Sequence, residues 1–302
     1  MTNLLPIFYT NILPIFIVIG MGYALERILR LEVKPVSRVA FYVLAPCLAF
    51  SSLVENQISG DELGHIAAFV ALITITVGVL TWLVAHTLHL SRPVESALLL
   101  STMFVNSGNY GIPLNLFAFG EAGQARAIMY LVISATLANT LGVYLAARGR
   151  ATGSNALRNL VKVPLVYAVL LASAVRFSRV TVPAPLFNAV NIVGRASVPV
   201  MLLVLGMQLA RISVTRDLGT ISLATFIRLI VTPALAFGLA AVMSLRGATR
   251  QTMIVEASMP TAVTSTILAL EFDARPDLVT SVVFLSTPLS PLTLTVIIAL
   301  VQ

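Results

Sequence analysis

Long apolar runs recur along the chain, and short polar connections separate them. A helix that spans a bilayer needs about 20 mostly apolar residues, and the pattern contains ten runs of roughly that length. They cover Leu5–Leu29, Val36–Val54, Leu63–Leu88, Pro93–Phe119, Ala125–Ala147, Val163–Phe177, Ala184–Ala210, Leu218–Leu245, Thr249–Leu270 and Leu278–Val301. No connection is long enough for a separate soluble domain. The pattern therefore predicts an all-α polytopic membrane protein with ten transmembrane helices.

The composition agrees with this prediction. Of the 302 residues, 58% are hydrophobic and 10% are charged, and the mean hydropathy is +0.97. A soluble domain carries about 25% charged residues. These values exclude a soluble enzyme, a disordered chain and a coiled coil. The single cysteine, Cys47, excludes an intrachain disulfide.

The formal net charge of +7 comes from basic residues that are unevenly distributed in the first half of the chain. The predicted spans place nine of them on one side, namely Arg27, Arg30, Lys34, Arg38, Arg92, Arg148, Arg150, Arg158 and Lys162, and only Arg126 on the other. Cytoplasmic loops carry the excess of Lys and Arg, so we expect both chain ends to lie outside. The second half is ambiguous, with Arg211, Arg216 and Arg275 inside and Arg176, Arg179, Arg246 and Arg250 outside.

Two similarities within the chain indicate an internal duplication. The residues around Pro46 in the second span resemble those around Pro199 in the seventh, and Leu131–Leu137 in the fifth resembles Phe284–Leu289 in the tenth. Both offsets are close to half the chain length, which predicts two five-helix repeats over residues 1–150 and 151–302. Since five is odd, the second repeat enters the membrane in the opposite orientation. Inverted repeats are typical of secondary transporters.

The fourth and ninth spans contain helix-breaking residues near their centres. The fourth reads Asn-Ser-Gly-Asn-Tyr-Gly-Ile-Pro over residues 106–113, and the ninth reads Ser-Met-Pro-Thr-Ala over residues 258–262. Glycine and proline interrupt helices, and at bilayer depth a break persists only where it is buried in protein or lines a polar cavity. Paired interrupted spans point to the binding site of a transporter. The alternative is a pair of ordinary proline kinks.

Each break predicts a new helix start near the membrane centre, at Pro113 and at Pro260. A helix start presents unpaired N–H groups and the positive end of the helix dipole. In inverted repeats the two starts converge, which favours an anion, most naturally a carboxylate. The candidate substrate-binding residues are Asn106, Ser107, Gly108, Asn109, Tyr110, Gly111, Pro113, Ser258, Pro260, Thr261 and Thr264.

Three charged residues stand out within the predicted spans, where each charge costs about 2.5–3.5 kcal/mol near the membrane centre. Glu256 lies one helical turn before Pro260 and is a candidate group for coupling to a proton or a cation. Arg195 is a candidate for attracting the anion. A structural ion pair or snorkelling toward the interface is the alternative for both, and is the interpretation that we favour for Arg228.

Several of these motifs resemble the auxin efflux carrier family, which includes the plant auxin exporters and bacterial malonate and malate permeases. They are the 106–113 segment, the Pro-Thr-Ala that begins at Pro260, the Leu-Ser-Thr-Pro-Leu-Ser of residues 285–290, and Val198–Met207 in the seventh span. The Asn-x-Gly-x-x-Gly-x-Pro pattern is fairly specific, whereas the other motifs are weak alone. The resemblance runs the length of the chain.

The resemblance implies a scaffold of helices 1, 2, 6 and 7, which often forms a homodimer, and a moving transport domain of helices 3–5 and 8–10. It also implies that the organic anion binds where helices 4 and 9 cross, with Asn109, Pro113 and Pro260 at the matching positions. The long cytosolic loop of many plant members is absent. We therefore expect a carrier of the bacterial type in the plasma membrane, here the bacterial inner membrane.

Other classes of protein fit the sequence less well. An intramembrane protease would need a zinc motif, a Ser–His pair or buried aspartates, and the aspartates here lie in predicted loops. A channel does not require paired broken helices. A sodium-coupled symporter of the bile-acid type would place more acidic and amide residues near the crossing. We therefore expect a transporter with no catalytic residues, cofactor, bound metal or nucleic-acid partner, which uses a proton or a sodium ion for any coupling.

Overall fold

The computed structural model describes residues 4–56, 58–146, 164–178, 180–212, 215 and 217–302. Apart from one isolated β-bridge, the regular structure of these residues is helical. The helices are α1 (Leu4–Ile7), η1 (Phe8–Ile12), α2 (Leu13–Leu29), α3 (Val33–Val39), η2 (Ala40–Leu44), α4 (Ala45–Glu55), α5 (Gly60–Thr87), α6 (Arg92–Met103), η3 (Ser107–Gly111), α7 (Ile112–Leu137), η4 (Ala138–Gly142), α8 (Val143–Ala146), α10 (Pro164–Ser178), α11 (Ala184–Arg195), α12 (Ser197–Ala210), α13 (Leu218–Phe226), η6 (Ile227–Val231), α14 (Thr232–Val242), α15 (Gly247–Ala257), α16 (Val263–Glu271) and α17 (Pro276–Val301).

The η elements are π-helical turns, and four of them have the same cause. The turns η1, η2, η3 and η6 each end two residues before a proline, at Pro14, Pro46, Pro113 and Pro233. In each case the residue just before the proline donates its N–H to the carbonyl five residues earlier. Proline lacks an N–H and its ring clashes with the carbonyl four residues earlier. The wider turn accommodates that ring and lets the helix continue.

Within the described residues, seven helical segments are long and apolar enough to cross a membrane by length and composition: Leu4–Leu29, Val33–Glu55, Gly60–Thr87, Ser107–Ala146, Ala184–Ala210, Leu218–Val242 and Pro276–Val301. The helices α6, α10, α15 and α16 are shorter. Six of the seven segments match predicted spans to within a few residues. The predicted count of ten spans remains a prediction.

The connection between the fourth and fifth predicted spans is a sharp break at Gly120, where two helices join within α7. Its φ of 67° and ψ of −161° form a backbone conformation that glycine adopts without strain. One predicted span requires correction. The seventh span is divided into α11 and α12 at Ala196. The boundary between the predicted repeats at residues 150 and 151 lies outside the described residues, as do Arg148, Arg150, Arg158, Lys162, Arg179 and Arg216.

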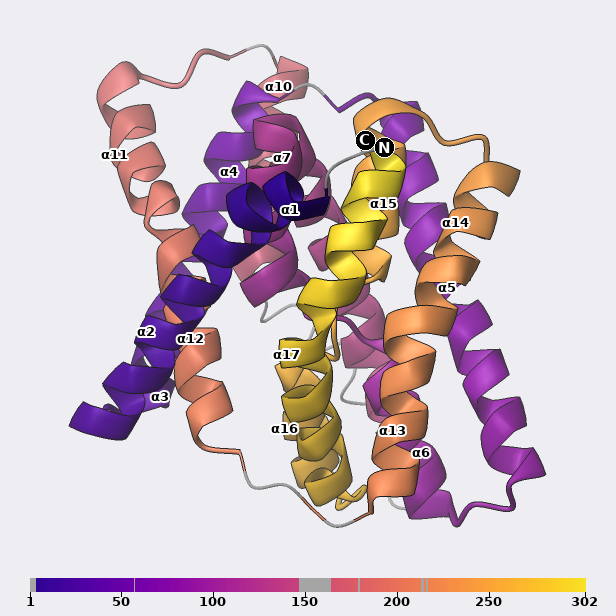
Figure 1. The fold of residues 1–302 in the computed structure, drawn as a ribbon. Helices are drawn as coiled ribbons and strands as arrows, with labels where there is room; N and C mark the ends of the chain where they lie inside the picture. Colours follow the sequence, from indigo (N-terminus) through magenta and orange to yellow (C-terminus); the bar gives the residue numbers. More distant parts are fainter. Residues whose placement is uncertain (1–3, 57, 147–163, 179, 213–214, 216) are drawn as a thin grey trace.

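The helices pack into two groups. In the first bundle, made of α1–α4 and α10–α12, α2 packs along α12 and α4 packs against α10 and α11. In the second bundle, made of α5–α8 and α13–α17, α7 packs along α15, α5 contacts α6 and α7, and α17 contacts α13 and α16. Figure 1 shows α2, α3, α11 and α12 on the left and α5, α6, α13 and α14 on the right. The start of α1 and the end of α17 lie at the same end of the molecule, where these two helices contact each other.

The first bundle depends on a close approach between α2 and α12. A Cβ on Gly22 would lie 2.1 Å from the carbonyl oxygen of Leu203, and a Cβ on Gly206 would lie 2.0 Å from that of Ile19. Small residues let two membrane helices come this close. At the end of the same pair, Arg211 Nε donates to Glu26 Oε1 over 2.9 Å. This contact makes α2 and α12 a tightly joined pair.

Candidate functional site

Two interrupted helices meet at mid-height in the molecule, with α6 approaching from below in Figure 1 and α15 from above. The chain is non-helical over Phe104–Asn106 after α6 and over Ser258–Ala262 after α15. We call these two segments the crossing. The N–H of Asn106 donates to the carbonyl of Pro260 over 2.9 Å, and the N–H of Ala262 donates to the carbonyl of Phe104 over 3.0 Å. These bonds form an antiparallel bridge between Val105 and Thr261.

Side chains from other elements satisfy the last carbonyls of α6. The last four carbonyls of a helix have no partner within it. Thr261 Oγ1 donates to the carbonyl of Ser101 over 2.7 Å, and Ser265 Oγ donates to the carbonyl one residue earlier over 2.9 Å. Arg228 Nη1 donates to the carbonyl of Thr102 over 2.5 Å. The break in α6 is therefore a satisfied helix end rather than a distorted helix.

Arg228 joins the ends of both interrupted helices. Its side chain is only 1% exposed. While Nη1 bonds the end of α6, Nη2 donates to the carbonyl of Ala257, the last residue of α15. The Nε atom is buried and has no hydrogen-bond partner. The residue lies in η6, the π turn before Pro233, so a proline in α14 helps to set the position of this guanidinium.

The two helix starts at the crossing present hydrogen-bond donors. The first N–H groups of η3 and α16 have no acceptor within their own helix. The side chain of Asn106, just before η3, is buried and its Nδ2 has no partner. Asn109, within η3, is half-buried. The unpartnered Asn106 amide therefore lies beside a helix start, where the helix dipole is positive.

Glu256 lies on the last turn of α15 and is fully buried. Its Oε1 accepts a hydrogen bond from Asn115 Nδ2 over 2.9 Å, and its carboxyl packs directly on Gly111. A Cβ on Gly111 would lie 2.5 Å from Glu256 Oε2. The glycine in η3 is therefore required for this carboxyl to approach. The other carboxyl oxygen, Oε2, has no hydrogen-bond partner.

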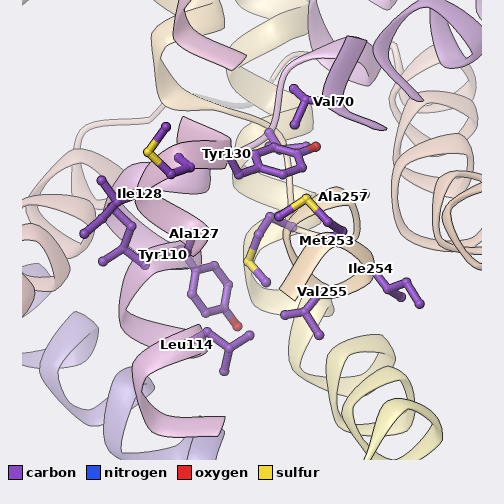
Figure 2. Close-up of a cluster of buried hydrophobic side chains, with 14 of the residues drawn as sticks. Val70, Tyr110, Leu114, Ala127, Ile128, Tyr130, Met253, Ile254, Val255 and Ala257 are labelled. Atoms are coloured by element: carbon purple, nitrogen blue, oxygen red, sulfur yellow. The ribbon is translucent and has the colours of Figure 1, made fainter. Parts of the chain in front are cut away.

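The proline-containing helix α17 packs beside the crossing. Ser286 Oγ accepts a hydrogen bond from the N–H of Thr261 over 3.3 Å, and Ser290 Oγ bonds the hydroxyl of Tyr110 over 3.3 Å. The ring of Tyr110 also makes an edge-to-face contact with Phe16 of α2, with 5.8 Å between ring centroids. Figure 2 shows Tyr110 within a cluster of buried side chains from η3, α7 and α15. The motif of residues 285–290 thus contributes directly to the site.

The structure brings some predicted residues together and separates others. At or beside the crossing are Asn106, Ser107, Gly108, Asn109, Tyr110, Gly111, Pro113, Glu256, Ser258, Pro260 and Thr261. The Ser258 and Thr261 hydroxyls already donate to the carbonyls of Ile254 and Ser101. Thr264 is exposed on α16. Arg195 is exposed on α11, where its Nε donates to Asn191 over 3.4 Å.

The structure also corrects the predicted role of Arg228 and extends the set of site residues. Arg228 neither forms an ion pair within 4 Å among the described residues nor snorkels, because its fully buried guanidinium bonds two backbone carbonyls. Asn115, Ser286 and Ser290 were missed as site residues. The spacing of Asn115, four residues after Gly111, was the available signal, because residues four apart share a helix face. The described residues contain no group of three or more His, Cys, Asp and Glu side chains that could hold a metal ion.

Sequence comparison with known proteins places this chain among transporters. The model of the family described as membrane transport protein matches residues 7–152 and 148–298. The chain is 29% identical to an uncharacterized transporter of Methanothermobacter thermautotrophicus, over 93% of this chain and 94% of that protein. It is 27% identical to an uncharacterized transporter of Methanocaldococcus jannaschii, over 95% and 96% of the two chains. The resemblance to the auxin efflux carriers is thereby confirmed.

Proposed function

Because the chain belongs to the membrane transport protein family, we propose that it is a secondary transporter that moves a small organic anion through a site at the crossing. The observation that carries this proposal is the pairing of the two interrupted helices by the hydrogen bonds between Asn106 and Pro260 and between Ala262 and Phe104. Coupled breaks of this kind bind substrate in secondary transporters. A pair of independent proline kinks would not require these bonds.

The polar groups at the crossing favour an anion with a carboxylate. Two helix starts supply N–H donors and the positive ends of their dipoles. Asn106 Nδ2 and Arg228 Nε are buried donors without a partner, and Asn109 is accessible enough to contact a ligand. Thr261 supports the site by capping α6 instead of binding the substrate directly.

The packing suggests how the site would alternate between the two sides of the membrane. We assign the first bundle to the scaffold and the second bundle to the transport domain, as the family resemblance implies. All parts of the crossing belong to the second bundle, so it would move as a unit against α2, α4 and α12. The proposal also includes ten spans in two inverted repeats and a homodimer formed by the scaffold. It places the protein in the plasma membrane with both chain ends outside.

Uptake into proteoliposomes tests the function. Purified protein is reconstituted and screened with radiolabelled mono- and dicarboxylates, and binding of each is checked by thermal shift in detergent. We expect saturable uptake of at least one carboxylate, and weaker binding when Asn106 is replaced by alanine. Absence of both binding and uptake across the carboxylates, with uptake of organic cations or neutral solutes instead, would overturn the proposed substrate class.

A further inference from the structure

Four buried oxygen atoms beside the crossing have no hydrogen-bond partner. They are Oε2 of Glu256, Oδ1 of Asn115, Oγ of Ser107 and Oγ1 of Thr252. The four residues are at most 1% exposed. Buried polar atoms nearly always have a partner in folded proteins, so a group of oxygens without one calls for a bound water, ion or ligand.

These residues lie on two helix faces that meet. Ser107 and Asn115 are each four residues from Gly111 along η3 and α7, and Thr252 is four residues from Glu256 on α15, so each set shares one face. The bond of 2.9 Å from Asn115 to Glu256 and the packing of the Glu256 carboxyl on Gly111 hold the two faces together. The Ser107 hydroxyl lies close to the Glu256 carboxyl, although not in hydrogen-bonding geometry.

The chemistry of the four atoms is that of a cation site. Asn115 Nδ2 donates to both Gly111 O, over 3.0 Å, and Glu256 Oε1, so its amide oxygen must face elsewhere. That oxygen and the free carboxylate oxygen are acceptors only. Hard cations bind carboxylate, amide and hydroxyl oxygens, and a single carboxylate suits one positive charge. We propose that Glu256, Asn115, Ser107 and Thr252 bind a monovalent alkali cation such as Na⁺.

The charge balance at the crossing connects this cation to the substrate, a step that rests on the proposed function. Of the charged residues that are buried in the described chain, Glu26, Arg228 and Glu256, only the last two lie at the crossing. The phenol of Tyr130 on α7 also faces them. With Glu256 ionised, as cation binding requires, its charge balances that of Arg228, so a bound carboxylate alone would leave one uncompensated negative charge at mid-membrane. Since such charge is costly there, the cation binds and moves together with the anion.

Equilibrium binding of radioactive Na⁺ to the purified full chain tests the site without any organic substrate. We expect saturable binding that K⁺ or Li⁺ reduces more than choline does. Glu256→Gln and Ser107→Ala should each lower the affinity for Na⁺ by about tenfold or more, because each removes one ligand oxygen or its charge. Glu271→Gln, at an exposed glutamate at the end of α16, should leave the binding unchanged. Absence of saturable binding, or full affinity in both variants, would overturn the cation site.

The same preparation separates this inference from the proposed function. Na⁺ binding without uptake of any carboxylate would leave the cation site standing and refute the anion transporter. Carboxylate uptake driven by a pH gradient, in a protein that does not bind Na⁺, would support the transporter and refute the cation site. If Glu256→Gln does not fold, Ser107→Ala still decides the question, because it removes a single hydroxyl that has no hydrogen-bond partner.

Discussion

At the scale of single residues, Arg228 makes a pair of contacts that another basic residue cannot reproduce. Its planar guanidinium bonds the carbonyls of Thr102 and Ala257, which end two different helices. Lysine presents one ammonium on a flexible stem and lacks this fork geometry. The arginine therefore positions α6 and α15 relative to each other, in addition to placing its free Nε near the proposed anion site.

Replacement of Arg228 by methionine should destabilise the second bundle and abolish transport. Each buried carbonyl left unpaired costs about 1–3 kcal/mol, so a fall in the thermal unfolding temperature of the purified protein should accompany the loss of uptake. Arg228→Lys should recover part of the thermal stability but little uptake, because one ammonium cannot bond both carbonyls in the same way. Arg246→Met, at an exposed arginine just before α15, is the control. Equal stability of the Arg228→Met and Arg246→Met proteins would contradict the positioning role.

Replacing Asn109 tests the hydrogen-bond donors of the proposed anion site. Asn109→Ala should weaken binding of the transported carboxylate by one to two decades, because one hydrogen bond to a charged ligand contributes roughly 1.5–3 kcal/mol. The thermal stability without ligand should change little, because Asn109 is only half-buried. Isothermal titration of the carboxylate found in the uptake screen measures the effect. Asn191→Ala, which alters an amide on the surface helix α11, is the matched control, and unchanged affinity in the Asn109 variant would move the site away from η3.

At the scale of elements, the requirement for glycine in η3 has a different origin from the one that the sequence suggested. The sequence predicted that Gly111 breaks the helix, whereas the structure shows that it admits the carboxyl of Glu256. Even one methyl group at this position would lie 2.4 Å from Glu256 Oε1.

Gly111→Ala should therefore reduce uptake strongly although alanine favours helix. The carboxyl would have to move away from Asn115, which would also weaken Na⁺ binding at the proposed cation site. Gly238→Ala in α14, where a Cβ would meet no atom within 4 Å, should keep full uptake. Proteoliposome uptake and Na⁺ binding of the two alanine variants check this expectation, and normal transport by Gly111→Ala would show that the close packing is dispensable.

The elements also show what the sequence can and cannot reveal. Apolar periodicity and the proline and glycine clusters were enough to place most spans and both breaks, since these are local properties. The partner of each broken end depends on contacts over long distances in the chain. The bond from Ser265 to the end of α6 links residues 165 positions apart, and Arg228 reaches Thr102 across 126 positions. No single-sequence pattern encodes such pairs, which is why Arg228 was not identified as a site residue.

At the scale of the whole molecule, the contacts within each bundle differ from the contact between the two bundles. The first bundle is held by the backbone contact between α2 and α12. In the second, Arg126 of α7 bonds both Glu62 of α5, over 2.7 Å, and Thr249 of α15, over 3.1 Å. Between the bundles, Phe16 contacts Tyr110 edge to face. The proposed alternating access would need motion at this boundary instead of within each bundle.

Cross-linking across that boundary should stop transport. In a Cys47→Ser background, the Phe16→Cys and Tyr110→Cys pair joins α2 of the first bundle to η3 of the second, and a short bifunctional thiol reagent with a reducible bond should block uptake. Each preparation is compared with itself before cross-linking, so any effect of the substitutions alone cancels.

The Glu26→Cys and Arg211→Cys pair replaces a contact within the first bundle, and its cross-linking should leave uptake unchanged because no relative motion is expected there. Recovery of uptake after reduction would show that motion was the cause. Continued uptake with the Phe16–Tyr110 positions cross-linked would mean that the bundles do not move past each other at this contact, and the assignment of scaffold and transport domain would have to be abandoned.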